Sequence, residues 1–156
     1  MARASRRVSL PSEVGGQCVF CGIAAGRQPA SVVADEQDVL AFCDLQPVHP
    51  GHLLVIPRVH ATGLAELPDA TGRAMFSLAQ RLAMALRACG LPCEGVNLFL
   101  ADGAAAGQEI DHVHLHVVPR TVGDGAVRIS AAWSLHDRAR LDDTAARVRG
   151  VLSGSS

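Results

Sequence analysis

The sequence of 156 residues has almost no net charge, no long apolar run and an odd number of cysteines. A formal net charge of −1 provides no long-range field for a polyanion, so the sequence argues against a nucleic acid partner. No apolar run approaches the roughly 20 residues that a membrane-spanning helix needs, which argues against a membrane partner. Five cysteines without a recognisable secretion signal argue against a disulfide framework. We therefore expect a cytoplasmic protein with neither kind of partner.

What the sequence does contain is enough apolar residues for one packed core. Hydrophobic residues make up 49% of the chain and charged residues 19%, which is typical of a globular domain. The region between Asp69 and Cys89 predicts one long helix, because apolar residues recur there at steps of three and four: Met75, Leu78, Leu82 and Leu86. Short apolar runs predict strands at residues 32–33, 39–42, 53–56 and 96–101, and a short helical turn is expected at 22–26.

The order of these elements predicts an α+β fold. Strands clustered around one main helix favour an antiparallel β-sheet of about five strands, and a C-terminal helix is expected at about residues 142–152. We expect a flexible N-terminal tail over residues 1–16, the folded domain over 17–130 and a C-terminal extension with its helix over 131–156. The basic, serine-bearing residues 1–7 are expected to belong to the tail, with a short transit peptide as the alternative.

Three histidines at alternate positions are the most informative feature of the chain. Successive side chains of a strand point to opposite faces, so the three imidazoles are expected on one face and apolar side chains on the other. The histidines are His112, His114 and His116, and the apolar residues are Val113, Leu115 and Val117. Imidazole serves both as a metal ligand and as a catalytic nucleophile, so a metal cluster and covalent catalysis both fit the motif.

The residues around this motif favour catalysis on a phosphate. A central histidine is well placed as a nucleophile if it is neutral, with one ring nitrogen free and the other N–H held by an acceptor such as a backbone carbonyl. His116 can then hydrogen-bond a phosphoryl oxygen or the bridging atom. The small residues 104–107 precede the motif, and backbone amides in such a run can approach a phosphate closely.

The segment from Gly107 to Arg120 resembles the signature of the histidine triad (HIT) superfamily, in which Gly-Gln precedes the three alternating histidines. The likeness covers about residues 17–130 and includes further motifs in the family's order: Cys18-Val19-Phe20-Cys21, Phe42-Cys43-Asp44, residues 50–57 and His60. The resemblance implies a nucleotide hydrolase or nucleotidyl transferase with the fold expected above. It also implies a homodimer whose two sheets join into one.

The resemblance assigns roles to individual residues. It implies that His114 attacks the α-phosphorus and forms a nucleotidyl-histidine that water hydrolyses, with His116 and Gln108 as the other catalytic residues. It implies that the nucleotide is bound by eight residues: Phe20, Ile23, Phe42, Asp44, Leu45, His52, Gly107 and Gln108. The residues themselves leave plainer roles open, namely ordinary core for the four apolar side chains, a turn aspartate for Asp44 and a buried histidine for His52.

A pair of cysteines near the start of the domain is a candidate for part of a metal site. Two cysteines separated by two residues need two more ligands to close a tetrahedral site. The resemblance to the zinc-bearing branch of the family supplies them, and the implied ligands of a structural zinc ion are Cys18, Cys21, His60 and His112. Reduced thiols, with His112 hydrogen-bonded inside the sheet, are the alternative. His49 is a competing ligand, whereas His136 is expected to be solvated.

Two positions depart from the family pattern. Many members carry an amide side chain at the position of Ala101 and a serine or threonine at the position of Glu109. An ionised carboxylate cannot donate a hydrogen bond and repels a nearby phosphate, so the leaving-group preference is put in doubt.

The expected activity is cleavage of a nucleoside monophosphate, most readily adenylate, from a phosphoramidate, an acyl adenylate or a dinucleoside polyphosphate. The alternatives are a catalytically weak nucleotide-binding or scaffold module, which Ala101 and Glu109 favour, and a protein whose three triad histidines hold one metal ion.

Overall fold

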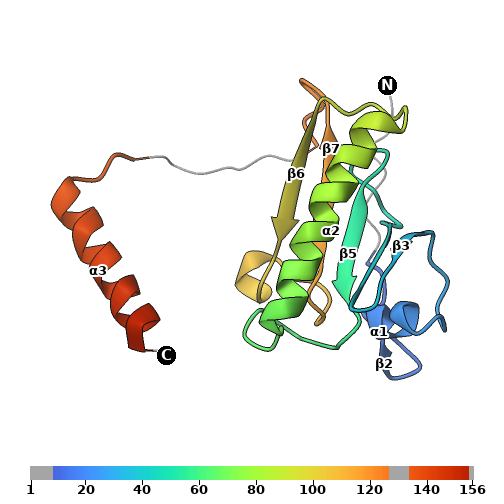
Figure 1. Cartoon of the computed structure of the whole chain (residues 1–156), viewed down its shortest axis with the longest axis horizontal. Helices are drawn as coiled ribbons and strands as arrows, with labels where there is room; N and C mark the ends of the chain where they lie inside the picture. Colours follow the sequence, from blue (N-terminus) through green and yellow to red (C-terminus); the bar gives the residue numbers. More distant parts are fainter. Residues whose placement is uncertain (1–8, 127–133, 155–156) are drawn as a thin grey trace.

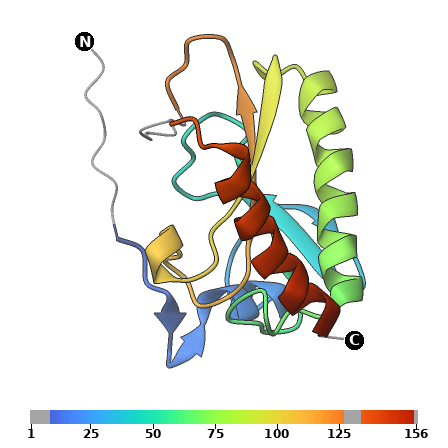
Figure 2. The same ribbon diagram turned by 90° about the vertical axis from the view of Figure 1, so that its left-hand side faces the viewer.

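The computed structural model describes residues 9–126 and 134–154 and contains one five-stranded antiparallel sheet (Figures 1 and 2). The strands lie in the order β3-β4-β5-β7-β6. Their bounds are β3 Val32–Asp35, β4 Val39–Cys43, β5 Leu53–Pro57, β7 Leu115–Arg120 and β6 Gly95–Leu100. The long helix α2, Asp69–Ala88, covers one face of this sheet, and the short helix α1, Val19–Ala24, packs on the other. The predicted α+β class, with an antiparallel sheet, one main helix and a C-terminal helix, is confirmed.

The two faces of the sheet bury two separate apolar clusters. In β4, Val39 and Ala41 face α2, whereas Leu40 and Phe42 face α1, as the twofold period of a strand requires. Because both faces are covered, β4 and β5 are almost continuously apolar rather than alternating. The cluster on the α1 side matters most for function because the histidines share that side. Its buried members are Phe20, Leu40, Phe42, Leu54 and Ile56.

The helix α2 is amphipathic in the way that its sequence predicts. The residues Met75, Leu78, Leu82 and Leu86 are buried in the cluster that faces the sheet. No helix in the described ranges is long and apolar enough to cross a membrane.

Some element boundaries differ from the prediction. The strand expected from His112 onward begins only at Leu115, because the backbone N–H of Val113 donates to Ala61 O (2.8 Å), outside the sheet. The sequence period shows which face a side chain takes, but it does not show where the neighbouring strand stops pairing. The helical turn expected at 22–26 is the helix α1, which begins at Val19.

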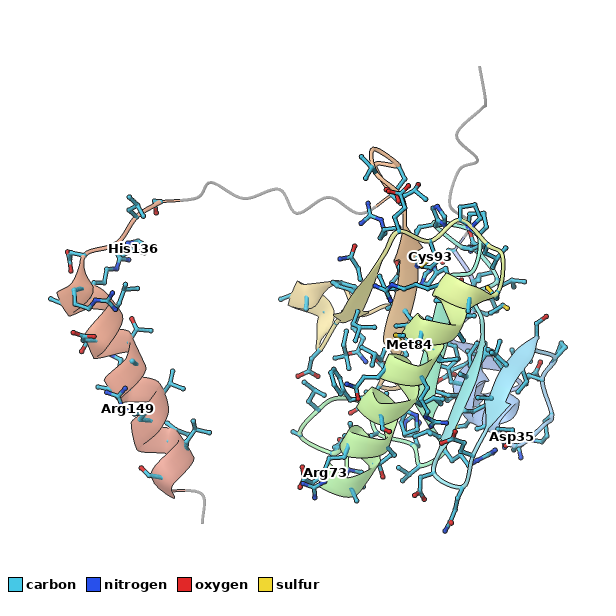
Figure 3. All side chains as sticks on the ribbon, turned by 45° about the horizontal axis from the view of Figure 1, so that its top comes forward. Asp35, Arg73, Met84, Cys93, His136 and Arg149 are labelled. Carbon is cyan, nitrogen blue, oxygen red and sulfur yellow. The ribbon has the colours of Figure 1, made fainter. Side chains whose placement is uncertain are left out.

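The two ends of the chain are described only in part. Of the expected tail, residues 1–8 lie outside the described residues, while β1 (Glu13–Val14) pairs with β2 (Gln17–Cys18). Of the C-terminal extension, residues 131–133 and 155–156 lie outside them, and the predicted helix is α3, Arg138–Gly154. The helix α3 lies apart from the sheet and buries none of its residues, and Arg149 is labelled on it in Figure 3. The short 3-10 helix η1, Ala104–Ala106, precedes the histidine motif.

Candidate active site and metal centre

The three histidines of the motif point to the α1 side of the sheet. The intervening Val113 is 1% exposed and belongs to the opposite cluster, under α2. The ring of Phe20, on α1, lies 5.8 Å from that of His112 and 5.3 Å from that of His114, measured between centroids. The alternation predicted from the sequence is therefore present, although His112 and His114 precede the hydrogen-bonded strand.

His114 is held by one hydrogen bond that defines its tautomer. Its Nδ1 lies 2.8 Å from the carbonyl oxygen of His112, and because a carbonyl can only accept, Nδ1 must carry the proton. The second ring nitrogen, Nε2, then carries the lone pair. The ring is 6% exposed and lies 5.0 Å from the ring of His116. In a neutral ring, this hydrogen bond leaves Nε2 as the nucleophilic nitrogen.

His112 has no exposed surface, and its two ring nitrogens have different surroundings. Its Nε2–H donates to Pro57 O at 3.0 Å, which leaves Nδ1 unprotonated. Burial lowers the pKa of His112 and so favours the neutral ring. Three further donor atoms surround Nδ1: Cys18 Sγ at 3.5 Å, Cys21 Sγ at 3.5 Å and His60 Nδ1 at 3.3 Å.

We call Cys18, Cys21, His60 and His112 the four-donor cluster. A tetrahedral zinc ion with bonds of about 2.0–2.1 Å to nitrogen and 2.3 Å to sulfur places two nitrogens about 3.3 Å apart and a nitrogen and a sulfur about 3.6 Å apart. The contacts in the cluster range from 3.2 to 3.5 Å, so its donors are spaced as around one such ion. The carbonyl behind His112 is the outer partner that a metal-bound imidazole commonly has.

The thiols of the four-donor cluster lie close to the surface. Cys18, Cys21 and His60 line a hollow of about 390 Å³ together with Gln17 and Arg27. Burial, with a smaller contribution from Cys18, raises the pKa of Cys21. The cluster therefore combines one deeply buried imidazole with donors that an ion can reach from solvent.

A second group of polar residues lies beside His116. The Nε2 atom of His52 is 2.8 Å from His116 Nδ1, and its Nδ1 atom is 3.4 Å from Asp44 Oδ2. His52 is 4% exposed, and the other oxygen of Asp44 accepts a hydrogen bond from Gln46 N at 2.8 Å. We call Asp44, His52 and His116 the carboxylate–histidine chain. Its two contacts use opposite nitrogens of the His52 ring, and one donor atom from each of the three residues lies within 4.8 Å of the others.

Gln108 makes its side-chain hydrogen bonds to the backbone. Its Nε2 donates to Thr62 O (2.7 Å) and Ile110 O (2.9 Å), and its Oε1 accepts from Gly103 N (2.7 Å). Gln108 therefore fixes the loop before the histidine motif to the segment that follows β5.

The same loop contains Gly107, and the two positions that depart from the resembled motif, Ala101 and Glu109, lie on either side of it. Gly107 has φ of 85°, a left-handed conformation that favours glycine. Its N–H and that of Gln108 donate to carbonyls within the loop, at 3.0 and 3.2 Å. Ala101 is buried and 4% exposed, whereas the side chain of Glu109 is exposed.

The four apolar residues expected around a base do not share one environment. Phe20 and Phe42 are buried and lie edge to face with ring centroids 5.7 Å apart, and Ile23 packs against their cluster. Leu45 is 79% exposed and lies outside that cluster. Phe20 and Phe42 are thus close to the triad, whereas Leu45 has little contact with the rest of the chain.

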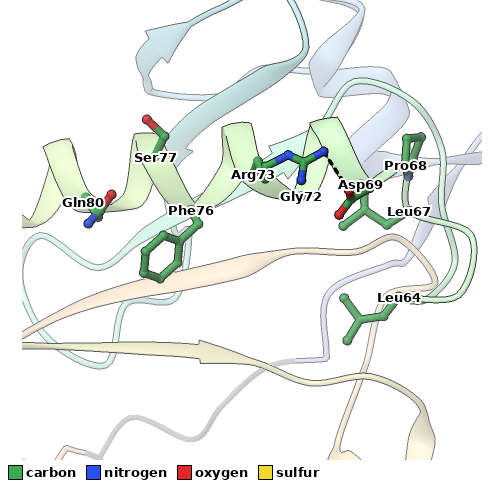
Figure 4. A pocket seen from close by; sticks show the side chains of 9 residues that line it. All are labelled: Leu64, Leu67, Pro68, Asp69, Gly72, Arg73, Phe76, Ser77 and Gln80. Atoms are coloured by element: carbon green, nitrogen blue, oxygen red, sulfur yellow. Dashed lines mark ion pairs between the residues drawn. The ribbon is translucent and has the colours of Figure 1, made fainter. Parts of the chain in front are cut away.

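Another hollow lies on a different part of the molecule. It has a volume of about 520 Å³ and runs beside α2, where Figure 4 shows Phe76, Leu64 and the Asp69–Arg73 ion pair. No triad histidine lines this hollow. The candidate active site is therefore the group formed by the three histidines and their hydrogen-bond partners.

The sequence did not reveal the backbone partners of the histidines. The carbonyls of Pro57 and His112 carry no side-chain signature, and only the fold brings them to the imidazoles. The link between Asp44 and His52 was also missed, although both residues were singled out separately. His49 lies away from the thiols, with its Nδ1 3.1 Å from Pro50 O, and His136 is exposed as expected.

Comparisons with known proteins agree with this arrangement. The HIT domain family matches residues 25–123. The chain is 39% identical over 110 residues to an uncharacterised HIT-like protein of Methanocaldococcus jannaschii, covering 70% of this chain and 84% of that one. It is 32% identical over 114 residues to the adenosine 5′-monophosphoramidase of Saccharomyces cerevisiae, covering 73% of this chain and 69% of the yeast protein.

A solved structure supports the same assignment. The zinc-bound histidine triad family protein from Mycobacterium smegmatis has a TM-score of 0.68 and 37% identity, covering 81% of this chain and 96% of that one. The domain match over residues 25–123, the identity to these relatives and the shared fold show that the chain belongs to the HIT domain family.

Proposed function

We propose that this protein is a nucleotide hydrolase or nucleotidyl transferase that releases adenylate from phosphoramidates, acyl adenylates or dinucleoside polyphosphates. The observation that carries the proposal is the hydrogen bond from His114 Nδ1 to His112 O, which leaves Nε2 as the nucleophilic nitrogen. The similarity to a yeast adenosine 5′-monophosphoramidase supports adenosine as the nucleoside and a phosphoramidate as one substrate class. We propose residues 17–130 as the catalytic domain.

The reaction proceeds in two displacements at phosphorus. In the first, His114 Nε2 attacks the α-phosphorus, and a P–N bond to the ring forms as the bond to the leaving group breaks. The electron pair of that bond goes to the leaving atom, which takes up a proton when it is an amine. In the second, water attacks the adenylyl-histidine, adenylate departs, and His114 regains its neutral form. The fixed tautomer prepares the ring for both steps.

The neighbouring residues have supporting roles in this proposal. His116 contacts the phosphoryl group or leaving atom, and Asp44 accepts hydrogen bonds from the ribose hydroxyls. Phe20, Ile23 and Phe42 provide the apolar side of the base site, with Leu45 at its margin. Gln108 acts by fixing the loop that contains Gly107 beside the phosphate site, and His52 lines the same site.

We propose that the four-donor cluster holds a structural zinc ion. The spacing of its donors and the zinc-bound relative support this assignment. A bound zinc ion would link the segment around α1 to the residues before β7 and would keep its two thiolates deprotonated. The protein's own contribution is the Pro57 carbonyl, which orients the His112 ring. A cytoplasmic location, where thiols remain reduced, is consistent with this site.

The homodimer is proposed to form through β6. This strand is an edge of the sheet, and apolar side chains next to it are exposed: Leu98 at 38%, Phe76 at 54% and Met84 at 67%. Figure 3 labels Met84 on α2. We expect Leu98→Asp to give a monomer by analytical ultracentrifugation, whereas Val33→Asp on the opposite edge, β3, should leave the dimer intact.

The proposed activity is tested by trapping the covalent intermediate. Wild-type protein mixed with an adenosine phosphoramidate and quenched in alkali should gain the mass of one adenylyl group on the peptide that contains His114. His114→Ala should lose the adduct and turnover while the protein remains folded, as circular dichroism can check. Turnover near the wild-type rate in this variant would remove the mechanism.

A binding or scaffold module is the second candidate, and the exposed Glu109 with the buried Ala101 favours it. Such a module would bind adenylate, detectable by calorimetry, but would form no adduct with any adenylylated substrate.

A further inference from the structure

We propose that Arg58 is a positioning residue that holds helix α1 against the sheet and so fixes the apolar wall of the base site. This inference rests on the proposed function and deepens it, because α1 carries Phe20 and Ile23, two of the residues proposed to contact the base. Arg58 follows Pro57, the last residue of β5, and its side chain is 30% exposed. It joins the end of β5 to α1 and to the end of β3.

The carbonyl groups at the end of α1 show what Arg58 contributes. The last four carbonyl groups of a helix have no partner within the helix. In α1, three of them accept hydrogen bonds from the backbone that follows: Cys21 O from Ala25 N–H (3.1 Å), Gly22 O from Arg27 N–H (2.8 Å) and Ile23 O from Gly26 N–H (2.9 Å). The fourth, Ala24 O, accepts a hydrogen bond from Nη1 of Arg58 at 2.6 Å. A side chain from the end of β5 therefore completes the end of α1.

The other nitrogens of the guanidinium bind the end of β3 and the turn that follows it. Nε donates to Glu36 O at 2.8 Å, and Nη2 forms an ion pair with Asp35, which Figure 3 labels. The backbone N–H of Arg58 also donates to Asp38 O at 2.9 Å. The planar group thus spans three acceptors in fixed directions, which the single nitrogen of a lysine cannot do. Arg58 therefore fixes α1 relative to β3 and β5.

The helix α1 depends on such contacts for its position, because it has only six residues. Isolated helices shorter than about 12 residues are marginal in water, so packing and tertiary hydrogen bonds decide where this one lies. Its Phe20 ring lies 5.7 Å from that of Phe42 and 5.3 Å from that of His114. The hydrogen bond that orients His114 comes from the backbone of His112 and does not involve α1. A shift of α1 therefore moves the apolar wall more than it moves the nucleophile.

This geometry separates binding of the base from the chemistry at phosphorus. Loss of the Arg58 contacts should loosen the wall and weaken binding of the nucleoside, while the His114 ring keeps its orientation. Binding that is lost equally from the ground state and the transition state raises KM and leaves kcat unchanged. A purine presents more apolar area to the wall than a pyrimidine does, so a loosened wall should also reduce the preference for adenosine over cytidine.

The kinetic test replaces Arg58 by methionine, which keeps an unbranched apolar stem and removes every donor. With adenosine 5′-phosphoramidate, we expect Arg58→Met to raise KM about tenfold while kcat changes by less than about threefold. The ratio of kcat/KM for adenosine and cytidine 5′-phosphoramidates should fall about fivefold. A smaller amount of folded protein would lower the rates with both substrates equally and would leave KM and this ratio unchanged.

Hydrogen exchange over residues 19–28 is a readout that needs no substrate. Mass spectrometry should show faster exchange of the backbone amides of this segment in Arg58→Met than in the wild type. Arg81→Met is the matched control, because Arg81 binds the side chain of Glu36 in the same turn at 2.8 Å but lies on α2. Asp35→Asn removes the ion pair and keeps both hydrogen bonds from Arg58 to backbone carbonyls. Both control variants should therefore resemble the wild type, and equal effects in Asp35→Asn and Arg58→Met would overturn the role at α1.

The outcomes separate this inference from the proposed function. Wild-type exchange in α1, or a wild-type KM and base preference in Arg58→Met, would overturn the inference although the protein remains a hydrolase. If wild-type protein forms no adenylyl-His114, the proposed function itself fails, while the exchange comparison still tests the position of α1. Circular dichroism checks that Arg58→Met is folded. If it is not, Arg58→Lys, which keeps the charge and loses part of the fork, takes its place with the same expected directions.

Discussion

The four-donor cluster and the carboxylate–histidine chain lie on the same side of the sheet, but their donor atoms are arranged differently. In the first, three atoms surround one nitrogen, His112 Nδ1, at 3.3–3.5 Å. In the second, His52 uses one ring nitrogen toward each neighbour. Two thiols and two imidazoles suit a tetrahedral zinc ion, whereas the second group offers two imidazoles and one carboxylate within 4.8 Å of one another. The two groups therefore differ in the number and kind of their donors as well as in the orientation of their rings.

Truncation of Phe20 should have the largest effect on the stability of the protein and on both groups of residues. In the sequence, Phe20 stands between Cys18 and Cys21. Its ring contacts the rings of Phe42, His112 and His114. Truncation of a buried phenylalanine usually costs about 3–5 kcal/mol, so Phe20→Ala should lower the free energy of unfolding by that amount. It should also lower both the affinity for zinc and the rate of adenylyl transfer, because the Phe20 ring packs against His112 and against His114.

Urea denaturation measures the first effect, and Phe20→Leu is the matched control, since it retains most of the buried volume. A loss below about 1 kcal/mol for Phe20→Ala would show that the ring does not support the two sites.

Removal of one thiol should separate the two sites. We expect Cys21→Ser to reduce the zinc content from one ion per chain to none after dialysis, because three remaining donors leave the tetrahedral site open. At zinc a thousandfold above its dissociation constant, the bound ion stabilises the wild type by about 4 kcal/mol, which the variant would lack. The adenylyl adduct on His114 should still form.

Atomic absorption and calorimetry measure these effects. Cys89→Ser is the control, since that cysteine is exposed and lies outside the four-donor cluster. Full zinc retention in Cys21→Ser would contradict the ligand assignment.

The pH dependence of zinc uptake should also distinguish the clusters. Burial raises the pKa of Cys21, so this thiol is protonated in the metal-free protein at neutral pH and must lose its proton when it binds zinc. Burial lowers the pKa of His112, so that ligand needs no deprotonation. Zinc affinity should therefore rise with pH through the neutral range, with protons released on binding.

Titration calorimetry in two buffers with different ionisation enthalpies gives the number of protons released. A value of zero at pH 7 would mean that the thiols are already ionised or do not bind the ion.

The sequence predicted the layout of the fold because its main signals are local. The spacing of Met75, Leu78, Leu82 and Leu86 defines the buried face of α2, and the apolar run of β5 ends at Pro57. The start of β7 was placed too early because strand pairing depends on the partner strands, which a single segment does not specify.

For the site, side-chain types and spacing identified which residues come together but not their connections. The CxxC pair, His60 and His112 were grouped through the resemblance, and the structure does bring them within contact distance. The hydrogen bonds of Gln108 to the loop and the link from Asp44 to His52 could not be predicted, since both depend on how separate loops fold against each other.

Substitution of Glu109 is expected to have the smallest effect on the reaction rate. It follows Gln108 in the loop before the histidine motif, and its exposed carboxylate stands where the resemblance predicts a hydroxyl. Two like charges about 4 Å apart in water repel by about 1 kcal/mol, so Glu109→Ser should speed the release of phosphate-type leaving groups by about fivefold or less. The rate with amine leaving groups should change little, because a departing amine takes up a proton and carries no negative charge. Single-turnover rates with a dinucleoside polyphosphate and an alkyl phosphoramidate measure the ratio. Glu94→Ser, at the other end of β6, is the control for a lost surface charge. An unchanged ratio would place Glu109 outside the site.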